Sequence, residues 1–272
     1  MGATGGHGQR RGGAPPTSAG PASPGPSPWP ACLWIVRHGQ SAGNAAADRA
    51  EATASDVIDI AERDADVPLS ALGERQARAL GRWFATQPPE QRPTVILSSP
   101  YRRAMQTARF VAEALPHQLA VFPDERLREK DLGSLDRLTR RGWAERFPEQ
   151  AEARRRLGKF YFRAPGGESW CDVVLRVRSV ADELQLRHGR ERPLIVAHQV
   201  VVLCLRYVIE RLDEAAILRI DADAPLANCA VTAYVTDQGS ALPRLTLYNH
   251  VAPLEEAHEP ITDATDPPVA PR

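Results

Sequence analysis

The sequence has little cysteine, no long hydrophobic run and no excess of either charge. Its four cysteines lie far apart and form no CxxC pair, which favours buried thiols in a reducing compartment over disulfides or a zinc site. No stretch of about 18 apolar residues occurs, so we expect no membrane span. The N-terminus lacks the apolar core of a signal peptide, and the expected location is cytoplasmic. The 34 basic and 34 acidic residues balance, which argues against nucleic acid as a partner.

The two ends of the chain are poor in residues that build a core. Residues 1–30 contain eight of the 19 glycines and seven of the 24 prolines, and residues 253–272 contain five more prolines. Segments of this composition cannot bury enough apolar surface to offset the loss of chain entropy. We therefore predict disordered tails at 1–30 and 253–272, on either side of a single domain at residues 31–252.

Short apolar runs recur through the central segment. LWIV (33–36), TVIL (94–97) and LIVA (194–197) are typical of strands that are buried on both faces. CAVTAYV (229–235) and LTLY (245–248) are further candidate strands.

Three helical patterns lie between these runs. Residues 71–85 repeat apolar side chains at helical spacing, and residues 169–187 begin with a serine that is followed three residues later by aspartate. Residues 99–115 begin with Ser99 and Pro100, which are typical of a helix N-cap and first position. Strands separated by helices predict an α/β fold, a three-layer α/β/α sandwich with a mostly parallel central sheet.

Polar side chains follow three of the predicted strands. Arg37 and His38 follow the first, Arg103 comes shortly after the second, and His198 follows the third. In open α/β sheets the carboxyl ends of the strands border the ligand crevice, where helix N-termini also favour anions. Arginine pairs with phosphate oxygens through its planar fork. The pattern therefore predicts an anion site, most plausibly for phosphate.

Each of these residues also has a plainer interpretation. A single histidine at a strand end is more often a hydrogen-bonded structural residue, and Arg37 or Arg103 alone fits a surface charge. A metal site is disfavoured because no carboxylate or cysteine stands at helical spacing from His38 or His198. The joint occurrence at three strand ends favours the phosphate site.

The motifs around these residues resemble those of the histidine phosphatase (phosphoglycerate mutase-like) superfamily. RHGQSAGN (37–44) is similar to the RHGxSxxN signature, SSPYRRAMQTA (98–108) to the second signature, and VAHQ (196–199) to the segment with the second histidine. The other matching segments, in family order, are LSALGERQA (69–77), LREKDLG (127–133) and PGGES (165–169). The resemblance spans residues 33–250.

The resemblance implies a phosphoglycerate mutase-like fold and a mechanism without a metal or an organic cofactor. His38 would attack phosphorus to form a phosphohistidine, and its second ring nitrogen would need a hydrogen-bond acceptor to fix the tautomer. Glu129 would protonate the leaving alcohol and then deprotonate the attacking water, with its pKa raised by the nearby phosphate. Asp131 is the neighbouring acidic candidate, but the resemblance favours Glu129.

The resemblance also implies how the phosphoryl group is bound. Arg37, Arg103 and His198 would contact the non-bridging oxygens, and Asn44 would donate a further hydrogen bond. Positioning and charge stabilisation of this kind supply most of the catalysis in phosphoryl transfer.

The substrate is suggested by finer motif detail, which is nearest to the fructose-2,6-bisphosphatase domain. Arg155 and Lys159 stand at the offsets from the GES motif where basic residues of that domain hold the far phosphate, and Gln199 also matches. Leu203, however, replaces an arginine of that domain, and no P-loop of a kinase half is found. The arginines at 154–156 fit a solvated helix face equally well. We expect a small phosphorylated metabolite as partner.

Residues 45–66 are longer than the connection expected after the first signature, and we refer to them as the insert. Their composition suggests a short helix followed by an acidic loop. Insertions after strand ends often form lids or pocket walls. We therefore expect the insert to shape the substrate pocket.

Three functions are compatible with the motifs. A phosphomonoester phosphatase is favoured. A phosphoglycerate mutase would carry an arginine-rich RRSYD-like region, which is not found. A non-catalytic phosphate-binding protein is disfavoured because every matched catalytic position is filled.

Overall fold

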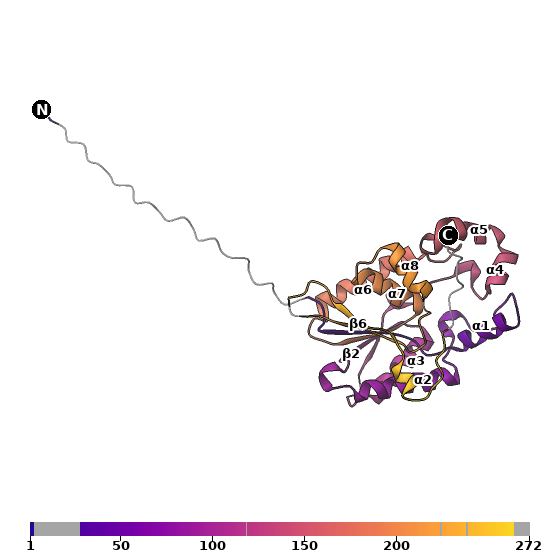
Figure 1. Ribbon diagram of the computed structural model, residues 1–272, viewed down its shortest axis with the longest axis horizontal. Helices are drawn as coiled ribbons and strands as arrows, with labels where there is room; N and C mark the ends of the chain where they lie inside the picture. The colour runs from indigo at the N-terminus through magenta and orange to yellow at the C-terminus, as the bar shows by residue number, and fades with distance from the viewer. Residues whose placement is uncertain (3–27, 118, 224, 238, 264–272) are drawn as a thin grey trace.

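The computed structural model describes residues 1–2, 28–117, 119–223, 225–237 and 239–263 (Figure 1). A six-stranded sheet has the order β3-β2-β4-β1-β5-β6. The strands are β1 Cys32–Arg37, β2 Val95–Ser98, β3 Val121–Pro123, β4 Pro193–Ala197, β5 Val231–Val235 and β6 Arg244–His250. The helices are α1 Ala42–Ala52, α2 Ala71–Thr86, α3 Arg102–Ala114, α4 Arg140–Arg146, α5 Pro148–Tyr161, α6 Trp170–Arg187, α7 Gln199–Ile209, α8 Glu214–Asp223 and α9 Ala252–Glu255.

The predicted three-layer sandwich is confirmed. β1, β2, β3 and β4 are parallel, and β5 runs antiparallel to β1 and to β6. Helices α6, α7 and α8 lie over one face of the sheet, and α2 and α3 lie over the other (Figure 1). Helices α1, α4 and α5 lie at one end of the molecule.

Alternation along the strands explains why both faces of the sheet are covered. Leu33 and Ile35 of β1 pack in the cluster under α6 and α7, whereas Trp34 and Val36 pack in the cluster under α2 and α3. Successive side chains of a strand point to opposite faces, so an unbroken apolar run supplies two cores. The short apolar runs therefore identified central strands correctly.

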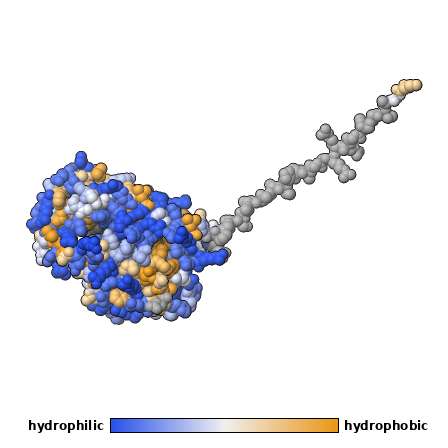
Figure 2. Space-filling model, turned by 180° about the vertical axis from the view of Figure 1, so that it is seen from behind, coloured by the Kyte–Doolittle hydropathy of each residue, from blue (hydrophilic) through white to orange (hydrophobic). Residues whose placement is uncertain are grey.

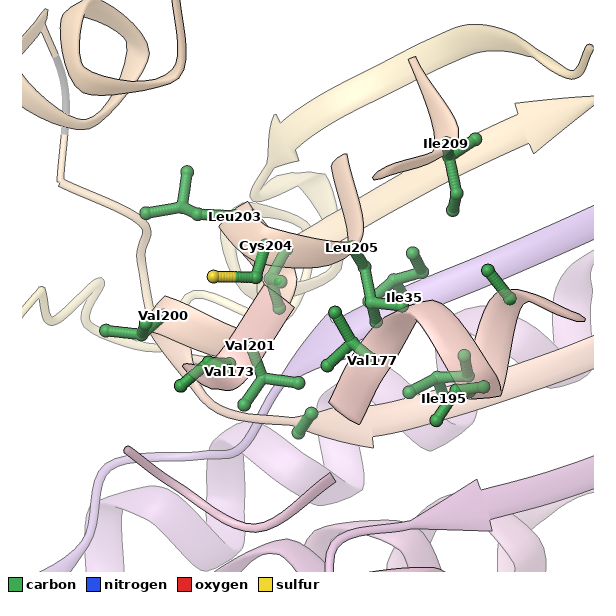
Figure 3. Close-up of a cluster of buried hydrophobic side chains, with 14 of the residues drawn as sticks. Ile35, Val173, Val177, Ile195, Val200, Val201, Leu203, Cys204, Leu205 and Ile209 are labelled. Atoms are coloured by element: carbon green, nitrogen blue, oxygen red, sulfur yellow. The ribbon is translucent and has the colours of Figure 1, made fainter. Parts of the chain in front are cut away.

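Helix α6 begins as its sequence predicts. Ser169 is the N-cap and forms a capping box with Asp172. The apolar side of the helix then packs toward the sheet. Figure 3 shows Val173 and Val177 of α6 beside Val201 and residues of β1 and β4.

The predicted start of the helix at Ser99 and Pro100 is wrong. Helix α3 begins at Arg102 with Tyr101 in extended conformation as its N-cap, and the Tyr101 side chain makes no capping hydrogen bond. The hydroxyl of Ser99 is engaged elsewhere: it accepts from the Tyr101 backbone N–H at 3.2 Å and contacts the ring of His198. A serine and a proline after a strand can therefore form a turn before the helix, and are not by themselves evidence of a helix N-cap.

The predicted boundary at residue 252 is too early. Helix α9 includes residue 253, and the segment after it packs on α2. The side-chain amide of Gln76 donates to the Pro260 carbonyl at 2.8 Å and to Thr262 Oγ1 at 3.1 Å, and Arg75 pairs with Glu259 at 2.9 Å. These polar anchors hold a segment whose composition alone suggested a tail.

The rest of the two predicted tails, residues 3–27 and 264–272, lies outside the described residues. Trp29 belongs to the first predicted tail and is nevertheless buried in the core beneath α6. Among the helices of the described residues, none has the length and apolar character that crossing a membrane would take. On the face in Figure 2, hydrophobic residues form separate patches among hydrophilic ones.

Candidate active site

The carboxyl ends of β1, β2 and β4 meet at one edge of the sheet. Arg37 pairs in register with Ala197, and Ser98 pairs with Val196. The residues that follow these strands are therefore brought together, as their positions in the sequence predict. A cavity of about 690 Å³ opens at this edge. The predicted site residues that line it are Arg37, His38, Asn44, Arg103, Glu129, Lys159 and Gln199.

Close backbone contact joins the first signature to the start of α2. A Cβ atom on Gly73 would lie 1.9 Å from the Gln40 carbonyl oxygen, and one on Gly39 would lie 2.6 Å from the Gly73 oxygen. Only glycine permits this approach. The Gln40 backbone N–H donates to Gln76 Oε1 at 2.8 Å, which fixes the turn that carries His38.

One ring nitrogen of His38 carries a lone pair. Its Nδ1 lies 2.7 Å from the Gly39 carbonyl oxygen. Because a carbonyl oxygen only accepts hydrogen bonds, we assign the proton to Nδ1 and the lone pair to Nε2. Arg103 Nε lies 3.3 Å from Nε2, in agreement with a lone pair at that atom. The acceptor that the mechanism requires is thus a backbone carbonyl.

The surroundings of His38 keep its imidazole neutral. Burial lowers the pKa of His38 well below 6.5, and the positive charges of Arg103 and Arg37 lower it further. The hydrogen bond to Gly39 opposes this shift but is smaller in effect. Protonation of His38 therefore does not remove the nucleophile until the pH is well below 6.5.

The ring of His198 packs edge-on against the ring of His38. The two ring centroids are 5.0 Å apart, and His198 is completely buried. Its Nε2 lies 2.8 Å from Ser99 Oγ, and its Nδ1 lies 3.6 Å from Glu129 Oε2. Burial lowers the pKa of His198 well below 6.5, and the positive charge of Arg103 lowers it further. His198 is therefore a neutral ring held between Ser99 and Glu129.

Ser99 determines which nitrogen of His198 carries the proton. Ser99 Oγ accepts from the Tyr101 backbone N–H and still has its own proton to donate, and His198 Nδ1 faces the Glu129 carboxylate at 3.6 Å, which favours a ring proton there. We therefore assign Ser99 as the donor to His198 Nε2 and place the ring proton on Nδ1. This tautomer gives His198 an N–H donor beside Glu129. The sequence placed Ser99 at the strand end but did not reveal this role.

Replacing Ser99 with alanine is expected to lower kcat by roughly 10- to 100-fold, because His198 loses the partner that fixes its tautomer. Steady-state kinetics with one substrate would check this. Ser98→Ala is the matched control, since Ser98 is equally buried but bonds to the Ser99 carbonyl. Ser99→Thr keeps the hydroxyl and should restore much of the rate. Equal effects of Ser99→Ala and Ser98→Ala would contradict a specific role.

Arg37 and Asn44 are held by the backbone around them. Arg37 is only 4% exposed, and its guanidinium donates through Nη1 to the Leu226 carbonyl. Asn44 lies in the first turn of α1, where its Oδ1 accepts from the Ser41 backbone N–H at 3.0 Å. This capping bond fixes the oxygen end of the Asn44 amide and leaves the NH2 end as the donor available to a ligand.

Arg103 connects His38 to the insert. Its Nε faces His38, and its two terminal nitrogens contact Asp64. The Arg103 side chain is 6% exposed, whereas that of Asp64 is 44% exposed. A guanidinium in contact with the His38 ring is placed where it could bind an anion such as a phosphoryl group.

The loop that carries Glu129 is anchored by the Glu168 of the PGGES motif. Arg176 Nε donates to Glu168 Oε1 at 3.0 Å, and Arg176 Nη2 donates to the Glu129 carbonyl at 3.2 Å. The Asp131 backbone N–H donates to Glu168 Oε2 at 3.1 Å. Burial acts to raise the pKa of Glu168, but the hydrogen bond and charge of Arg176 bring it below its usual value. Glu168 is therefore an ionised anchor that orients the acid loop.

Of the two acidic candidates in that loop, only Glu129 reaches the histidines among the contacts of the described residues. Its Oε1 accepts from the Lys130 backbone N–H at 2.8 Å, and its Oε2 faces His198. The Asp131 carboxylate instead accepts from the Gly133 backbone N–H at 2.8 Å and shapes the turn. The geometry thus agrees with the preference for Glu129.

The basic residues suggested as a second phosphate site are not assembled. Arg155 is 73% exposed and pairs with Glu152 on the surface, while its neighbour Arg154 lines the cavity. Successive side chains of a helix point about 100° apart, which explains why Arg154 and not Arg155 faces the cavity. Lys159 lines the cavity but is bound to Asp221 at 2.7 Å, with both side chains nearly buried.

The other two positions of that comparison lie on α7. Gln199, at its first residue, lines the cavity and is 7% exposed. Leu203 belongs to the hydrophobic cluster in Figure 3, so no charged group is present at that place. Only Gln199 of this pair is therefore available to a substrate.

The insert forms one wall of the cavity, as expected. Ile58, Ile60, Glu62 and Asp64 line it. The insert pairs with the segment before α4, where the Ile58 backbone N–H donates to the Arg137 carbonyl at 2.9 Å. The sequence indicated a pocket wall but gave no signal for which insert residue would reach Arg103.

Among the described residues, no three His, Cys, Asp or Glu side chains are grouped as metal ligands. All four cysteines are free thiols; Cys204 and Cys229 are buried as predicted, whereas Cys32 and Cys171 are only half-buried. The polar groups that line the cavity include imidazole, guanidinium, ammonium, carboxylate, amide and hydroxyl groups.

Comparison with known proteins agrees with this geometry. The family model of the histidine phosphatase superfamily (branch 1) matches residues 33–250. A probable phosphoglycerate mutase GpmB of Yersinia enterocolitica is 31% identical over 203 residues, 74% of this chain and 82% of that protein. A 6-phosphofructo-2-kinase/fructose-2,6-bisphosphatase of Caenorhabditis elegans is 32% identical over 187 residues, 67% of this chain but 35% of that protein.

Solved structures show the same fold. A mycobacterial glucosyl-3-phosphoglycerate phosphatase in complex with VO3 has a TM-score of 0.62 and 28% identity, over 80% of this chain and 98% of that one. Bacillus stearothermophilus YhfR has a TM-score of 0.64 over 82% of this chain and 98% of that one, at 23% identity.

Proposed function

The chain belongs to the histidine phosphatase superfamily (branch 1) and is a phosphatase, and we propose that it hydrolyses a small phosphomonoester through a phosphohistidine intermediate on His38. One observation carries the proposal. His38 Nε2 holds a lone pair next to Arg103, because Nδ1 donates to the Gly39 carbonyl. This is a neutral nucleophile already placed beside a cation that binds phosphate.

The proposed reaction has two displacements at phosphorus. His38 Nε2 forms a bond to phosphorus while the bond to the ester oxygen breaks, and Glu129 gives its proton to that oxygen. Water then forms the second bond to phosphorus as Glu129 takes its proton, and the bond to Nε2 breaks to release phosphate. Arg37 and Arg103 stabilise the charge on the non-bridging oxygens in both steps. We assign no metal or organic cofactor a part in either step.

We infer that the alcohol part of the substrate is recognised in part by apolar contact, and not by Arg155 and Lys159. Arg155 lies on the surface, Lys159 is bound to Asp221, and residue 203 is a buried leucine. The remaining wall of the cavity carries apolar side chains from the insert, from the segment before α4 and from α4 itself, namely Ile58, Ile60, Leu138 and Trp143. Apolar side chains of this kind contact the carbon atoms of small organic ligands, while Arg137, Arg140 and Arg154 add charged groups to the same lining.

Phosphoglycerate mutase activity is the second candidate. Relatives about 31% identical carry that name as a probable function, and the same phosphohistidine could pass its phosphoryl group to a second hydroxyl. The absence of an RRSYD-like region in the sequence argues against it.

An assay of substrate classes tests the proposal. Purified protein in EDTA should release phosphate from p-nitrophenyl and naphthyl phosphate, with higher kcat/KM than from fructose 2,6-bisphosphate. Isomerisation of 3-phosphoglycerate in the same buffer should be slower than its hydrolysis. Isomerisation faster than hydrolysis would establish the mutase instead. A higher kcat/KM for fructose 2,6-bisphosphate would contradict the inferred apolar recognition.

A further inference from the structure

A carboxylate from the insert occupies the phosphate-binding face of Arg103. Asp64 Oδ1 lies 2.9 Å from Arg103 Nη1, and Asp64 Oδ2 lies 3.3 Å from Arg103 Nη2. The Asp64 backbone carbonyl also accepts from Nη1, at 2.5 Å. Both terminal nitrogens of the guanidinium therefore contact oxygens of a single residue.

These nitrogens are the ones that a phosphoryl group would use. The third nitrogen, Nε, faces His38 Nε2 at 3.3 Å, so phosphorus attached to His38 would lie beside the same guanidinium. Arginine binds phosphate with two parallel N–H bonds, which is also how it binds a carboxylate. The oxygens of Asp64 and those of a substrate phosphate thus compete for the same donors.

The position of Asp64 is fixed by the rest of the insert. The Thr139 backbone N–H donates to the Asp56 carbonyl at 3.0 Å, and Arg137 Nη2 donates to the Glu62 carbonyl at 2.8 Å. Asp64 begins a short 3-10 turn that ends at Asp66. Because the Asp64 backbone carbonyl also contacts Arg103, displacing Asp64 from the guanidinium requires a shift of this turn and not only a side-chain rotation.

We propose that Asp64 is an internal substitute for the substrate phosphate, which must displace it from Arg103 in order to bind. The insert then acts as a lid that closes the empty site through Asp64. This inference rests on the proposed function only in taking Arg103 as a phosphate ligand. It gives the insert a specific part in binding, beyond its place in the cavity wall.

Competition of this kind lowers the apparent affinity for phosphate. A ligand that binds only the open state has its affinity reduced by the fraction of molecules in that state. The contact joins a buried guanidinium to a carboxylate that is 44% exposed, so solvent weakens it. Its removal should therefore strengthen phosphate binding by roughly three- to tenfold.

Calorimetric titration with inorganic phosphate tests the proposal. Asp64→Asn and Asp64→Ala should bind phosphate roughly three- to tenfold more tightly than the unaltered protein. Asp66→Asn is the matched control, because Asp66 lies in the same turn but pairs with the exposed Arg63 at 2.6 Å. It removes the same charge and should leave the dissociation constant unchanged.

The other outcomes are also decisive. Unchanged or weaker binding by both Asp64 variants would overturn the proposal, and weaker binding would indicate that Asp64 instead positions Arg103. Equal tightening by the Asp64 and Asp66 variants would overturn it too, since the effect would then be one of general charge. If none of the proteins bound phosphate, the proposed function would fail and this inference with it.

Discussion

Replacing His38 with glutamine is expected to lower kcat by about 10⁴-fold or more, because no other group supplies the bond to phosphorus. Glutamine keeps a polar side chain in a buried position but has no nucleophilic nitrogen. Binding of inorganic phosphate should persist, since Arg37 and Arg103 remain in place. Kinetics with p-nitrophenyl phosphate and titration with phosphate would measure the two effects separately.

His188→Gln is the control for this substitution. His188 follows the C-terminus of α6 and contacts Glu191, away from the cavity lining. Its replacement should leave kcat unchanged. A His38→Gln protein with kcat within about tenfold of the unaltered protein would contradict the assignment of His38, because loss of a covalent nucleophile costs far more.

Replacing Glu129 with glutamine is expected to affect substrates according to their leaving group. An alkyl phosphate needs a proton on its departing oxygen, so its kcat/KM should fall by about 10²- to 10⁴-fold. p-Nitrophenolate departs without a proton, so the first step with that ester should be nearly unchanged. Its second step still lacks a base for water, and a burst of p-nitrophenol equal to the enzyme concentration should precede slow turnover.

Asp131→Asn is the matched control for Glu129. Asp131 is two residues away in the same loop, but its carboxylate accepts from the Gly133 backbone N–H instead of facing His198. Its replacement should reduce kcat/KM equally for both substrates, and only slightly. If Glu129→Gln lowered kcat/KM by the same factor for both esters and gave no burst, Glu129 would not be the general acid.

The strands and the convergence of the site could be predicted from the sequence for a simple physical reason. Four-residue apolar runs have too little length for a helix, and parallel strands bring their carboxyl ends to the same edge. Arg37, His38 and His198 therefore had to lie close together once the sheet was assigned. The resemblance to a known family added Glu129, which no strand pattern would have placed.

Other features depend on contacts between distant segments. Ser99 has the local pattern of an N-cap, but its hydrogen bond to His198 spans 99 positions of the chain. Residues after 252 are held by Gln76 and Arg75 of α2, and the composition of the segment gives no sign of these contacts. The β3 strand, with three residues of which two are exposed, has no apolar run to reveal it.

The direction of side chains near the substrate pocket could not be predicted from the sequence for a similar reason. Motif spacing placed Arg155 in the site, but the orientation of α5 directs Arg154 into the cavity instead. Asp64 is one of several acidic residues in the insert, and only the folded turn selects it to contact Arg103. A run of charged residues in the sequence does not show which of their side chains point into the cavity.

The central claim is that His38 carries the phosphoryl group during turnover. The most direct measurement is to quench the reaction with p-nitrophenyl phosphate in alkali, where phosphohistidine survives. Peptide mass spectrometry then locates the phosphoryl group. We expect it on His38 of the unaltered protein, in greater amount in Glu129→Gln, and lost on treatment with acid. A phosphoryl group on any other residue, or a product burst in Glu129→Gln with no phosphorylated His38, would contradict the account.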